Sequence, residues 1–512
     1  MSKIIIIGAG IGGLATANLL AKAGHDVHVY EKEPMAGGRA GQFKKDGFTF
    51  DTGPSWYLMP DVFEHYFNLL DTSSKEQLDL IQLQPAYKVF FENNETLTIT
   101  GNLDKDAERF EAIEVGAGES LKKYVEKSDE TYQLSLKHFL YSNFTSPKDF
   151  LHADILKRAG KMLVLATTSI DSYVKKFVSH PHLKQILEYP MVFLGTSPFN
   201  APALYSLMSA LDFKEGVFYP RGTMYAVVEQ LVALGAQFGV TYHFGSPVKH
   251  VAVAHGTATG IELEDGSKIE TDILISNADL HFTETKLLDA QYQSYPEKYW
   301  QNKEASPSAL LLFLGIKGQV PEFEHHTLLF VEDWKANFDS IYNSKTAPEK
   351  ASLYISKTSQ SDKSTAPKGH ENIFVLVPLP ADMTLTEEKT KELTTHYLNQ
   401  IKTMTGVDLA SRTVTQTTFG PDDFKTKYHS WQASMLGPSH KLSQSAFFRT
   451  RNKSKKVSNL YYVGSGTVPG IGVPMCLISA ELIYKRLAGI KIGGRVDEIV
   501  NISITDAAKE VA

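Results

Sequence analysis

Near the amino terminus the chain reads IIIIGAGIGG over residues 4–13, a short run of isoleucines that passes directly into glycines. The run is typical of a buried parallel strand, and residues 14–23 predict the helix that follows it. Gly8 permits the tight turn, Gly10 lets the backbone approach a pyrophosphate, and Gly13 allows the helix to pack closely on the strand. The free N–H groups at the start of the helix favour phosphate, so this segment predicts a nucleotide-binding fold.

An acidic residue, Glu31, ends a second predicted strand at residues 26–30. A carboxylate in this position, about 20 residues beyond the glycines, can accept hydrogen bonds from both ribose hydroxyls of an adenosine. The strand–helix–strand unit therefore predicts a dinucleotide site, but it leaves both FAD and NAD open.

The segment that follows favours FAD. Gly38 and Arg39 place a flexible glycine and an arginine just beyond the second strand, where an arginine can reach back to a buried diphosphate. Residues 48–55 then read as a strand that breaks into a turn at Gly53. For Asp51 in this turn we expect a turn or capping role rather than chemistry.

Two distant segments complete the predicted nucleotide domain. A helix at residues 223–234 leads into a meander of strands that ends at residues 273–276. Near the carboxyl end, residues 459–474 read NLYYVGSGTVPGIGVP, a short strand and a glycine-rich loop that open a helix. Pro474 suits the first turn of that helix, where its missing N–H costs nothing. The N–H groups there suit the negative charge of a reduced flavin.

These segments resemble known flavoproteins over nearly the whole chain. The amino-terminal part is similar to the FAD-binding region of amine oxidases, protoporphyrinogen oxidase and carotenoid desaturases. Residues 459–474 resemble the Gly-x-Gly-Thr-x-Pro-Gly-x-Gly signature of bacterial-type phytoene desaturases, from which Val468 and Ile471 depart. The resemblance implies that the region around Gly53 lies near the flavin ring and that the backbone of Val248 bonds the adenine. The residues expected to bind FAD are Gly8, Gly10, Gly13, Glu31, Gly38, Arg39, Gly53, Val248, Gly464, Gly466, Gly472 and Val473.

The fold class we expect is α/β, with a Rossmann-like FAD-binding domain assembled from separated segments, a mixed-sheet substrate domain and a helical subdomain that faces a membrane. The FAD-binding segments are residues 1–84, 211–284 and 456–512; residues 85–210 form the helical, membrane-facing region and residues 285–455 the substrate domain. Strands are predicted at residues 309–316, 327–331, 353–356 and 373–378, and helices at 146–160, 161–178 and 202–211.

A membrane surface is one expected partner. Residues 148–178 mix apolar and basic side chains, as a helix lying in a bilayer interface does; an ordinary pair of surface helices with a solvated charged face is the alternative. No apolar run approaches the roughly 20 residues of a membrane span, and the features of a signal peptide are missing from the first residues. We therefore expect a cytoplasmic protein that is peripheral on the membrane.

Composition excludes several other classes of function. The net charge is −6 and no long basic block occurs, which argues against a nucleic-acid partner. Cys476 is the only cysteine, so an internal disulfide framework and a thiolate metal cluster are both excluded; we expect it in the core of the last helix. We expect no metal site, because the histidine pairs 180/182 and 325/326 lack partners at ligand spacing and are interpreted as loop residues.

The resemblance implies an FAD-dependent carotenoid desaturase that converts phytoene towards lycopene or a related product. A hydride would leave an allylic carbon for flavin N5, and a proton would leave the adjacent carbon. An apolar polyene substrate requires an apolar tunnel, and no catalytic side chain is assigned. A C30 dehydrosqualene desaturase, a carotene isomerase, a flavin amine oxidase and a non-catalytic FAD-binding protein stay open, as do the electron acceptor and the oligomeric state.

Overall fold

Three distant parts of the chain meet in one parallel sheet. The computed structural model of the protein describes residues 1–144, 157–491 and 493–502. Its first sheet has the order β19-β13-β1-β2-β9, and each neighbouring pair of strands is parallel. This arrangement confirms the predicted α/β domain assembled from separated segments. The strands are β1 (Lys3–Ile7), β2 (Asp26–Tyr30), β9 (Thr241–His243), β13 (Ile273–Ser276) and β19 (Leu460–Tyr462).

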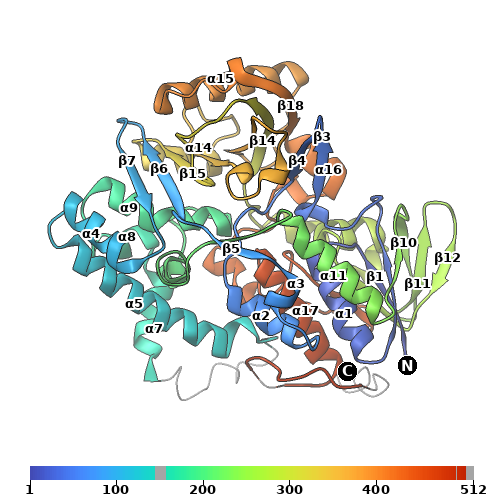
Figure 1. Cartoon of the computed structure of the whole chain (residues 1–512). Helices are drawn as coiled ribbons and strands as arrows, with labels where there is room; N and C mark the ends of the chain where they lie inside the picture. Colours follow the sequence, from blue (N-terminus) through green and yellow to red (C-terminus); the bar gives the residue numbers. More distant parts are fainter. Residues whose placement is uncertain (145–156, 492, 503–512) are drawn as a thin grey trace.

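The alternation of side chains along β1 produces the layers of this domain. Ile4 and Ile6 pack into a core with three helices, whereas Ile5 and Ile7 pack against an antiparallel meander on the opposite face. Because successive strand residues face opposite sides, one unbroken apolar run is covered on both faces (Figure 1). The helices are α1 (Ile11–Lys22), α11 (Tyr225–Gln237) and α17 (Val473–Leu487), and the meander is β10 (Val248–Ala254), β11 (Thr257–Leu263) and β12 (Lys268–Glu270).

A second, seven-stranded sheet has the order β18-β14-β17-β16-β15-β6-β7. It is mixed, because β15 and β6 pair in parallel whereas its other neighbouring strands are antiparallel. Leu310, Leu312 and Leu314 pack against α15 (Glu387–Thr405), which covers the outer face at the top of Figure 1. Leu311 and Phe313 face the other side. The strands are β6 (Tyr87–Phe91), β7 (Thr96–Ile99), β14 (Ser308–Lys317), β15 (His326–Phe330), β16 (Leu353–Ser356), β17 (His370–Leu379) and β18 (Thr413–Phe419).

The region expected to be helical differs from the prediction in three respects. It contributes the β6–β7 hairpin to the second sheet. The continuous helix predicted at residues 161–178 is wrong, because Thr168 is extended and the Ser169 hydroxyl accepts from Ser172 N (3.2 Å) to begin a new helix. Residues 203–206 form a 3₁₀ turn before a short helix. Residues 145–156 lie outside the described residues, so the predicted helix at 146–160 is described only in its last part.

In the helical region, α4 and α10 pack against α5. No helix among the described residues is long and apolar enough to cross a membrane. The helices are α4 (Leu103–Ile113), α5 (Ala117–Ser135), α7 (Ala159–Thr167), α8 (Ile170–Val174), α9 (Pro181–Glu188) and α10 (Leu207–Ala210). Elsewhere lie α2 (Pro60–Asn68), α3 (Ser74–Gln77), α12 (Leu280–Phe282), α13 (Glu297–Trp300), α14 (Trp334–Tyr342), α16 (Pro421–Tyr428), β3 (Gln42–Lys45), β4 (Phe48–Asp51), β5 (Leu80–Gln82) and β8 (Phe218–Pro220).

Asp51 joins the first nucleotide segment to the second. Its carboxylate accepts from the backbone N–H groups of Met224 (3.0 Å) and Tyr225 (3.2 Å) at the start of α11, and from the Tyr219 hydroxyl (3.3 Å). The expected capping role of Asp51 is therefore confirmed, although it caps a helix more than 170 residues away. Burial raises the pKa of the Asp51 carboxyl to about 6.

We expect the contribution of Asp51 to stability to fall as pH rises. Its folded pKa of about 6 lies above the unfolded value of about 3.9, so the folded state holds its proton more tightly. The contribution is complete below the unfolded pKa and is lost as pH rises through about 6. The difference in unfolding free energy between wild type and Asp51→Asn should fall by roughly 3 kcal/mol between about pH 4 and pH 7. Urea unfolding at each pH measures it.

The exposed carboxylate of Asp497 supplies the matched control, because Asp497→Asn removes one negative charge from the surface. Its stability difference should not follow the same curve. A flat difference for Asp51→Asn would show that the carboxyl at position 51 does not change its proton affinity on folding.

Candidate functional site

One large cavity connects the two sheets and the helical region. It has a volume of about 950 Å³ and begins at the β1–α1 loop. From there it passes the start of α17 and continues between the inner face of the seven-stranded sheet and the helical region. Ten of the residues expected to bind FAD lie in its wall: Gly8, Gly10, Glu31, Gly38, Arg39, Gly53, Val248, Gly464, Gly472 and Val473.

The glycine loop closes around the side chain of Asn277. A Cβ on Gly10 would lie 2.7 Å from Asn277 Nδ2, and one on Gly464 would lie 2.8 Å from Asn277 Oδ1. Gly13 is not in the cavity wall; a Cβ there would overlap the carbonyl oxygen of Gly8, so this position is needed for the close approach of α1 to β1. Backbone without side chains is what a pyrophosphate requires at this point.

Sequence reasoning did not assign Asn277 to the site. Its Nδ2 donates to the carbonyl oxygen of Gly8 (3.4 Å), and its backbone N–H donates to the carbonyl oxygen of Ile7 (2.8 Å). The available signal was its place directly after strand β13, at the same sheet edge as the loop that follows β1.

Glu31 lies beside this loop with both carboxylate oxygens oriented by backbone. Oε2 accepts from Ala9 N (2.7 Å) and Oε1 from Glu33 N (2.9 Å). Each oxygen keeps a second lone pair, so the carboxylate can still accept from ribose hydroxyls. Burial raises the pKa of Glu31 above its ordinary value. Ser246, two residues before Val248, donates its backbone N–H to the carbonyl oxygen of Glu31 (2.8 Å). Glu31 and Val248 both line the cavity, at the end where an adenosine would be held.

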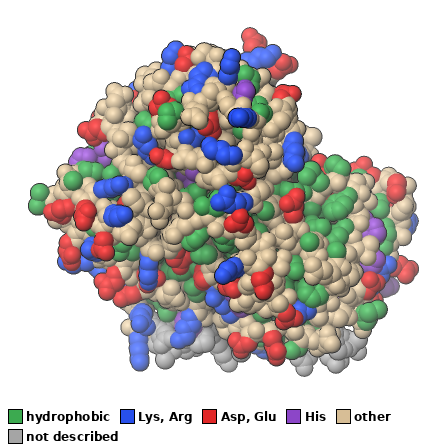
Figure 2. All heavy atoms as spheres, in the orientation of Figure 1, with side chains coloured by type: hydrophobic (Ala, Val, Ile, Leu, Met, Phe, Trp, Pro, Cys, Tyr) green, Lys and Arg blue, Asp and Glu red, His purple; other side chains and the backbone are tan. Residues whose placement is uncertain are grey.

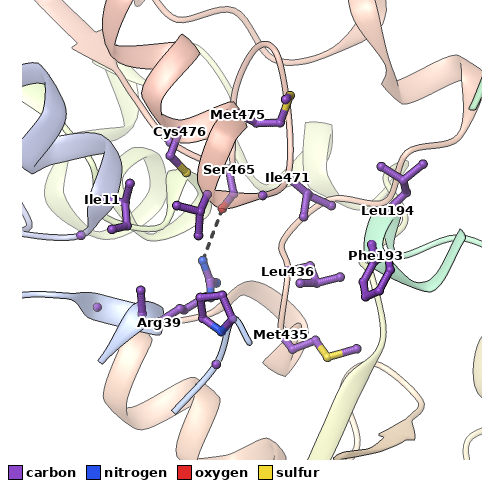
Figure 3. A pocket seen from close by; sticks show the side chains of 18 of the residues that line it. Ile11, Arg39, Phe193, Leu194, Met435, Leu436, Ser465, Ile471, Met475 and Cys476 are labelled. Carbon is purple, nitrogen blue, oxygen red and sulfur yellow. Dashed lines mark hydrogen bonds between the residues drawn. The ribbon is translucent and has the colours of Figure 1, made fainter. Parts of the chain in front are cut away.

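Arg39 connects the first and third nucleotide segments. Its Nη2 donates to Ser430 Oγ (2.8 Å), and its Nη1 donates to Ser465 Oγ (3.4 Å) in the loop before α17 (Figure 3). Asp279 Oδ2 lies 3.9 Å from Nη2. A guanidinium has five N–H donors, so Arg39 can bind a diphosphate while keeping these partners. Gly53 packs against it, because a Cβ on Gly53 would overlap the carbonyl oxygen of Arg39.

The carboxyl-terminal loop leads to the start of α17. Gly472 precedes the helix at a φ of 120°, and Pro474 lies in the first turn, as the sequence predicts. Gly466 does not line the large cavity but a small one of about 30 Å³ next to it. Cys476, expected in the core, instead lines the large cavity while packing partly against the core (Figure 3). Burial raises the pKa of its thiol to about 11, so it stays protonated.

His440 and Arg449, which sequence reasoning did not assign, hold this loop in place. His440 Nε2 accepts from the backbone N–H of Ile471 (3.2 Å), and Nδ1 lies 3.0 Å from the Tyr205 hydroxyl. Arg449 donates from Nε to the carbonyl oxygen of Thr467 (2.9 Å). Burial keeps the pKa of His440 well below its ordinary range, so the imidazole is neutral and can accept. No spacing in the sequence marks His440, which is 31 residues from Ile471.

Of the two histidine pairs expected in loops, one member of each lies in a bend and the other in a regular element. His326 begins β15, is fully buried and stacks on Trp56 with ring centroids 4.1 Å apart. His325 Nδ1 lies 2.7 Å from Ser361 Oγ. His180 caps α9, and His182 lies within that helix. The loop interpretation is confirmed for His180 and His325, which lie in bends, and is wrong for His182 in α9 and His326 in β15, whose rings stack on Phe91 and Trp56.

Among the residues described, no group of three or more histidine, cysteine or acidic side chains is arranged to hold a metal ion. The glycine cradle, Arg39 and Glu31 instead match two parts of FAD that need recognition near its adenosine: backbone N–H groups and a cation for the diphosphate, and an acceptor for the ribose. These hydrogen-bonding and charged groups therefore fit FAD.

We expect His440→Leu to weaken FAD binding and stability, whereas His440→Gln preserves most of both. Leucine leaves the Ile471 N–H buried without an acceptor, which costs about 1–3 kcal/mol, whereas the glutamine Oε1 can accept in place of Nε2. The dissociation constant for FAD, measured by quenching of flavin fluorescence, should rise about tenfold or more for the leucine variant. Equal constants for the two variants would contradict a role for the His440–Ile471 hydrogen bond.

Comparison with known proteins agrees with this site. The model of the family "Flavin containing amine oxidoreductase" matches residues 11–482. The chain is 40% identical to the carotenoid 3,4-desaturase of Haloarcula japonica, over 93% of this chain and 96% of the relative. It is 32% identical to the zeta-carotene-forming phytoene desaturase of Myxococcus xanthus, over 95% of this chain and 93% of the relative.

Solved structures share the fold. An oxidoreductase from Methanosarcina mazei superposes with a TM-score of 0.59 at 17% identity, covering 94% of this chain and 99% of that one. Putrescine oxidase bound to putrescine gives a TM-score of 0.59 at 14% identity, covering 94% and 97%. At these identities the likeness concerns the fold alone. Together with the family match and the glycine cradle, it shows that the chain belongs to the flavin-containing amine oxidoreductases and is an FAD-dependent oxidoreductase.

Proposed function

We propose that the protein is a carotenoid desaturase that introduces double bonds into a long polyene precursor. The observation that carries this proposal is the continuity of the cavity, which runs from the nucleotide-binding loops into a long apolar part without a break. Apolar walls bind a hydrocarbon through exclusion of water and need no hydrogen-bonding handle. The names of the relatives in Haloarcula japonica and Myxococcus xanthus support the same class of substrate.

The apolar part of the cavity is formed by several elements. Figure 3 shows its beginning, where Phe193, Leu194, Met435, Leu436 and Ile471 surround the space beside Arg39. Beyond them the wall continues along α14, the inner face of the second sheet and the helical region, with residues that include Leu311, Phe338, Ile341, Phe374, Leu376, Met162, Leu204 and Met208. A linear polyene is the shape of substrate that such a passage suits.

FAD would accept the hydride taken from an allylic carbon, as flavins do in dehydrogenations. The protein supplies orientation and a water-poor surrounding for the substrate carbon chain. Our first candidate for the substrate is phytoene, converted towards lycopene or a related product. A second candidate is a partly desaturated carotenoid that is desaturated further at its 3,4 position. The name of the 40% identical relative favours this candidate. A C30 precursor is a third, since diapophytoene desaturases of Staphylococcus aureus are 29% identical.

We expect the FAD-loaded protein to lose its flavin colour when it is mixed with phytoene in liposomes without oxygen. The extracted pigments should then contain longer conjugated polyenes, and the number of added double bonds gives the number of steps. The second and third candidate substrates are tested in the same way. An oxidised flavin and unchanged polyenes, in protein that is folded and holds its FAD, would contradict the proposal, and bleaching by amines instead would indicate an amine oxidase.

We further propose that the protein takes its substrate from a membrane surface at α7. This helix exposes Leu163 (65%) and Val164 (49%), while its neighbour Met162 lines the cavity. Lys157, Arg158 and Lys161 stand beside these apolar residues, and Lys and Arg side chains lie at the lower left of Figure 2, over α7. Apolar residues beside basic ones suit a helix that lies on an anionic bilayer.

Leu163→Glu combined with Val164→Glu should lower binding to anionic vesicles about fivefold or more, because two apolar contacts with the lipid are replaced by negative charges. Sedimentation with vesicles of phosphatidylglycerol and phosphatidylcholine measures the bound fraction. Val414→Glu is the matched control, since Val414 is comparably exposed (53%) but lies on strand β18. Equal loss of binding in both variants would contradict a specific role for α7.

A further inference from the structure

Among the described residues, the apolar part of the cavity offers no charged group to a reacting carbon. Four carboxylates line the cavity among the described residues, and all of them lie at the nucleotide end: Glu31, Glu33, Glu264 and Asp279. The cations in its wall, Lys32, Arg39 and Lys427, lie at the same end. Asp212 is a buried carboxyl elsewhere in the molecule, but Tyr189 stands between it and the cavity and donates its hydroxyl to Asp212 Oδ2 (2.5 Å).

A desaturation nevertheless creates charge on the substrate. Bound FAD would supply the hydride acceptor: when an allylic C–H bond breaks, both of its electrons would leave with the hydride, and the carbon skeleton would carry a positive charge spread over the polyene. The adjacent carbon then releases a proton to water, and the electrons of that C–H bond form the new double bond. In the apolar part, where the described residues place no carboxylate, the groups that can stabilise the cation are the faces of aromatic rings, which carry negative potential.

Trp56 occupies the junction between the nucleotide end and the apolar part. Residues 52–56 all line the cavity, and Gly53 within this run packs against the backbone of Arg39. The Trp56 ring lies 5.4 Å from the ring of Phe193, and Figure 3 shows Phe193 facing the same space as Ile471 and Leu436. Trp56 therefore stands where the substrate chain would come closest to the flavin-binding loops.

The surroundings of Trp56 keep positive charge away from its ring. His326 covers one face of the indole, with ring centroids 4.1 Å apart and an angle of 6° between the planes. His326 Nδ1 lies 2.7 Å from the Tyr354 hydroxyl, which donates onward to Ser55 Oγ (2.8 Å). Burial lowers the pKa of His326 well below its ordinary value, so the imidazole behind the indole is neutral. A protonated imidazole there would repel the substrate cation.

We propose, resting on the desaturase function above, that Trp56 is a catalytic residue whose indole face stabilises the carbocation formed on the polyene as the hydride leaves. Tryptophan gives the strongest cation–π interaction of the aromatic residues, and the interaction strengthens when water is excluded. The ring acts on the transition state more than on the neutral substrate, so that it affects the rate of hydride transfer rather than the binding of the polyene.

The test varies the electron density of the aromatic ring at position 56 while the shape of the ring stays nearly constant. Trp56 is replaced by 4-methoxyphenylalanine, by 4-cyanophenylalanine and, as Trp56→Phe, by phenylalanine, and each protein is checked for FAD content and melting temperature. Flavin reduction by saturating polyene is followed in single turnovers without oxygen. We expect the cyano variant to be about tenfold slower than the methoxy variant, with phenylalanine between them, and the dissociation constants of the polyene to agree within about twofold.

The same pair of replacements at Phe338 on α14 is the matched control, because Phe338 also lines the cavity but lies on a different element; there the two rates should agree. Equal rates for the cyano and methoxy proteins at position 56 would show that Trp56 contributes only shape and would overturn this inference, while the desaturase function stands. A wild-type flavin that no polyene reduces would overturn both, so the two failures are distinguishable.

Discussion

The structure depends on the absence of side chains around Asn277. Gly8 and Gly10 lie in the first nucleotide segment, Gly464 lies in the third, and Asn277 ends the second. Each glycine approaches this asparagine so closely that a Cβ would have no room or only crowded room. These positions do not tolerate a side chain, because overlap with backbone or with a fixed side chain cannot be relieved by a rotamer change. The three segments are therefore fixed relative to one another before any cofactor is considered, and the nucleotide cradle follows from that packing.

Strand positions in both sheets could be predicted well, because each sheet is built from short β-branched and apolar runs. The length of such a run and the turn residues that flank it are visible in the local sequence. The runs at residues 309–316 and 373–378 correspond to β14 and β17. Helices that mix apolar and polar residues were harder to predict. The break at Thr168, for example, depends on a cap by Ser169 and on pairing of Ser169 with Pro202. Tertiary context decides such breaks, and a single sequence does not contain it.

The residues of the candidate site also fall into a group that the sequence predicts and a group that it does not. The glycines, Glu31 and Arg39 form motifs with fixed spacing, and the structure brings most of them to one cavity wall. Asn277, His440 and Trp56 belong to no sequence motif, since each contacts residues that are distant in the sequence. His325 and His326 show the limit most clearly: the neutrality of both, and the stacking of His326 on Trp56, are consequences of burial in the finished fold.

The order of strands in the first sheet has a consequence for how the protein is made. Its strands come from residues 3–7, 26–30, 241–243, 273–276 and 460–462, so one edge of the sheet is missing until nearly the entire chain has left the ribosome. Contacts of such long sequence separation form late, and a chain that waits with an open sheet edge and an unlined apolar cavity is prone to aggregate. Chaperones that shield the nascent chain, and a supply of FAD at the moment when β19 and α17 dock, would therefore decide how much active protein a cell obtains.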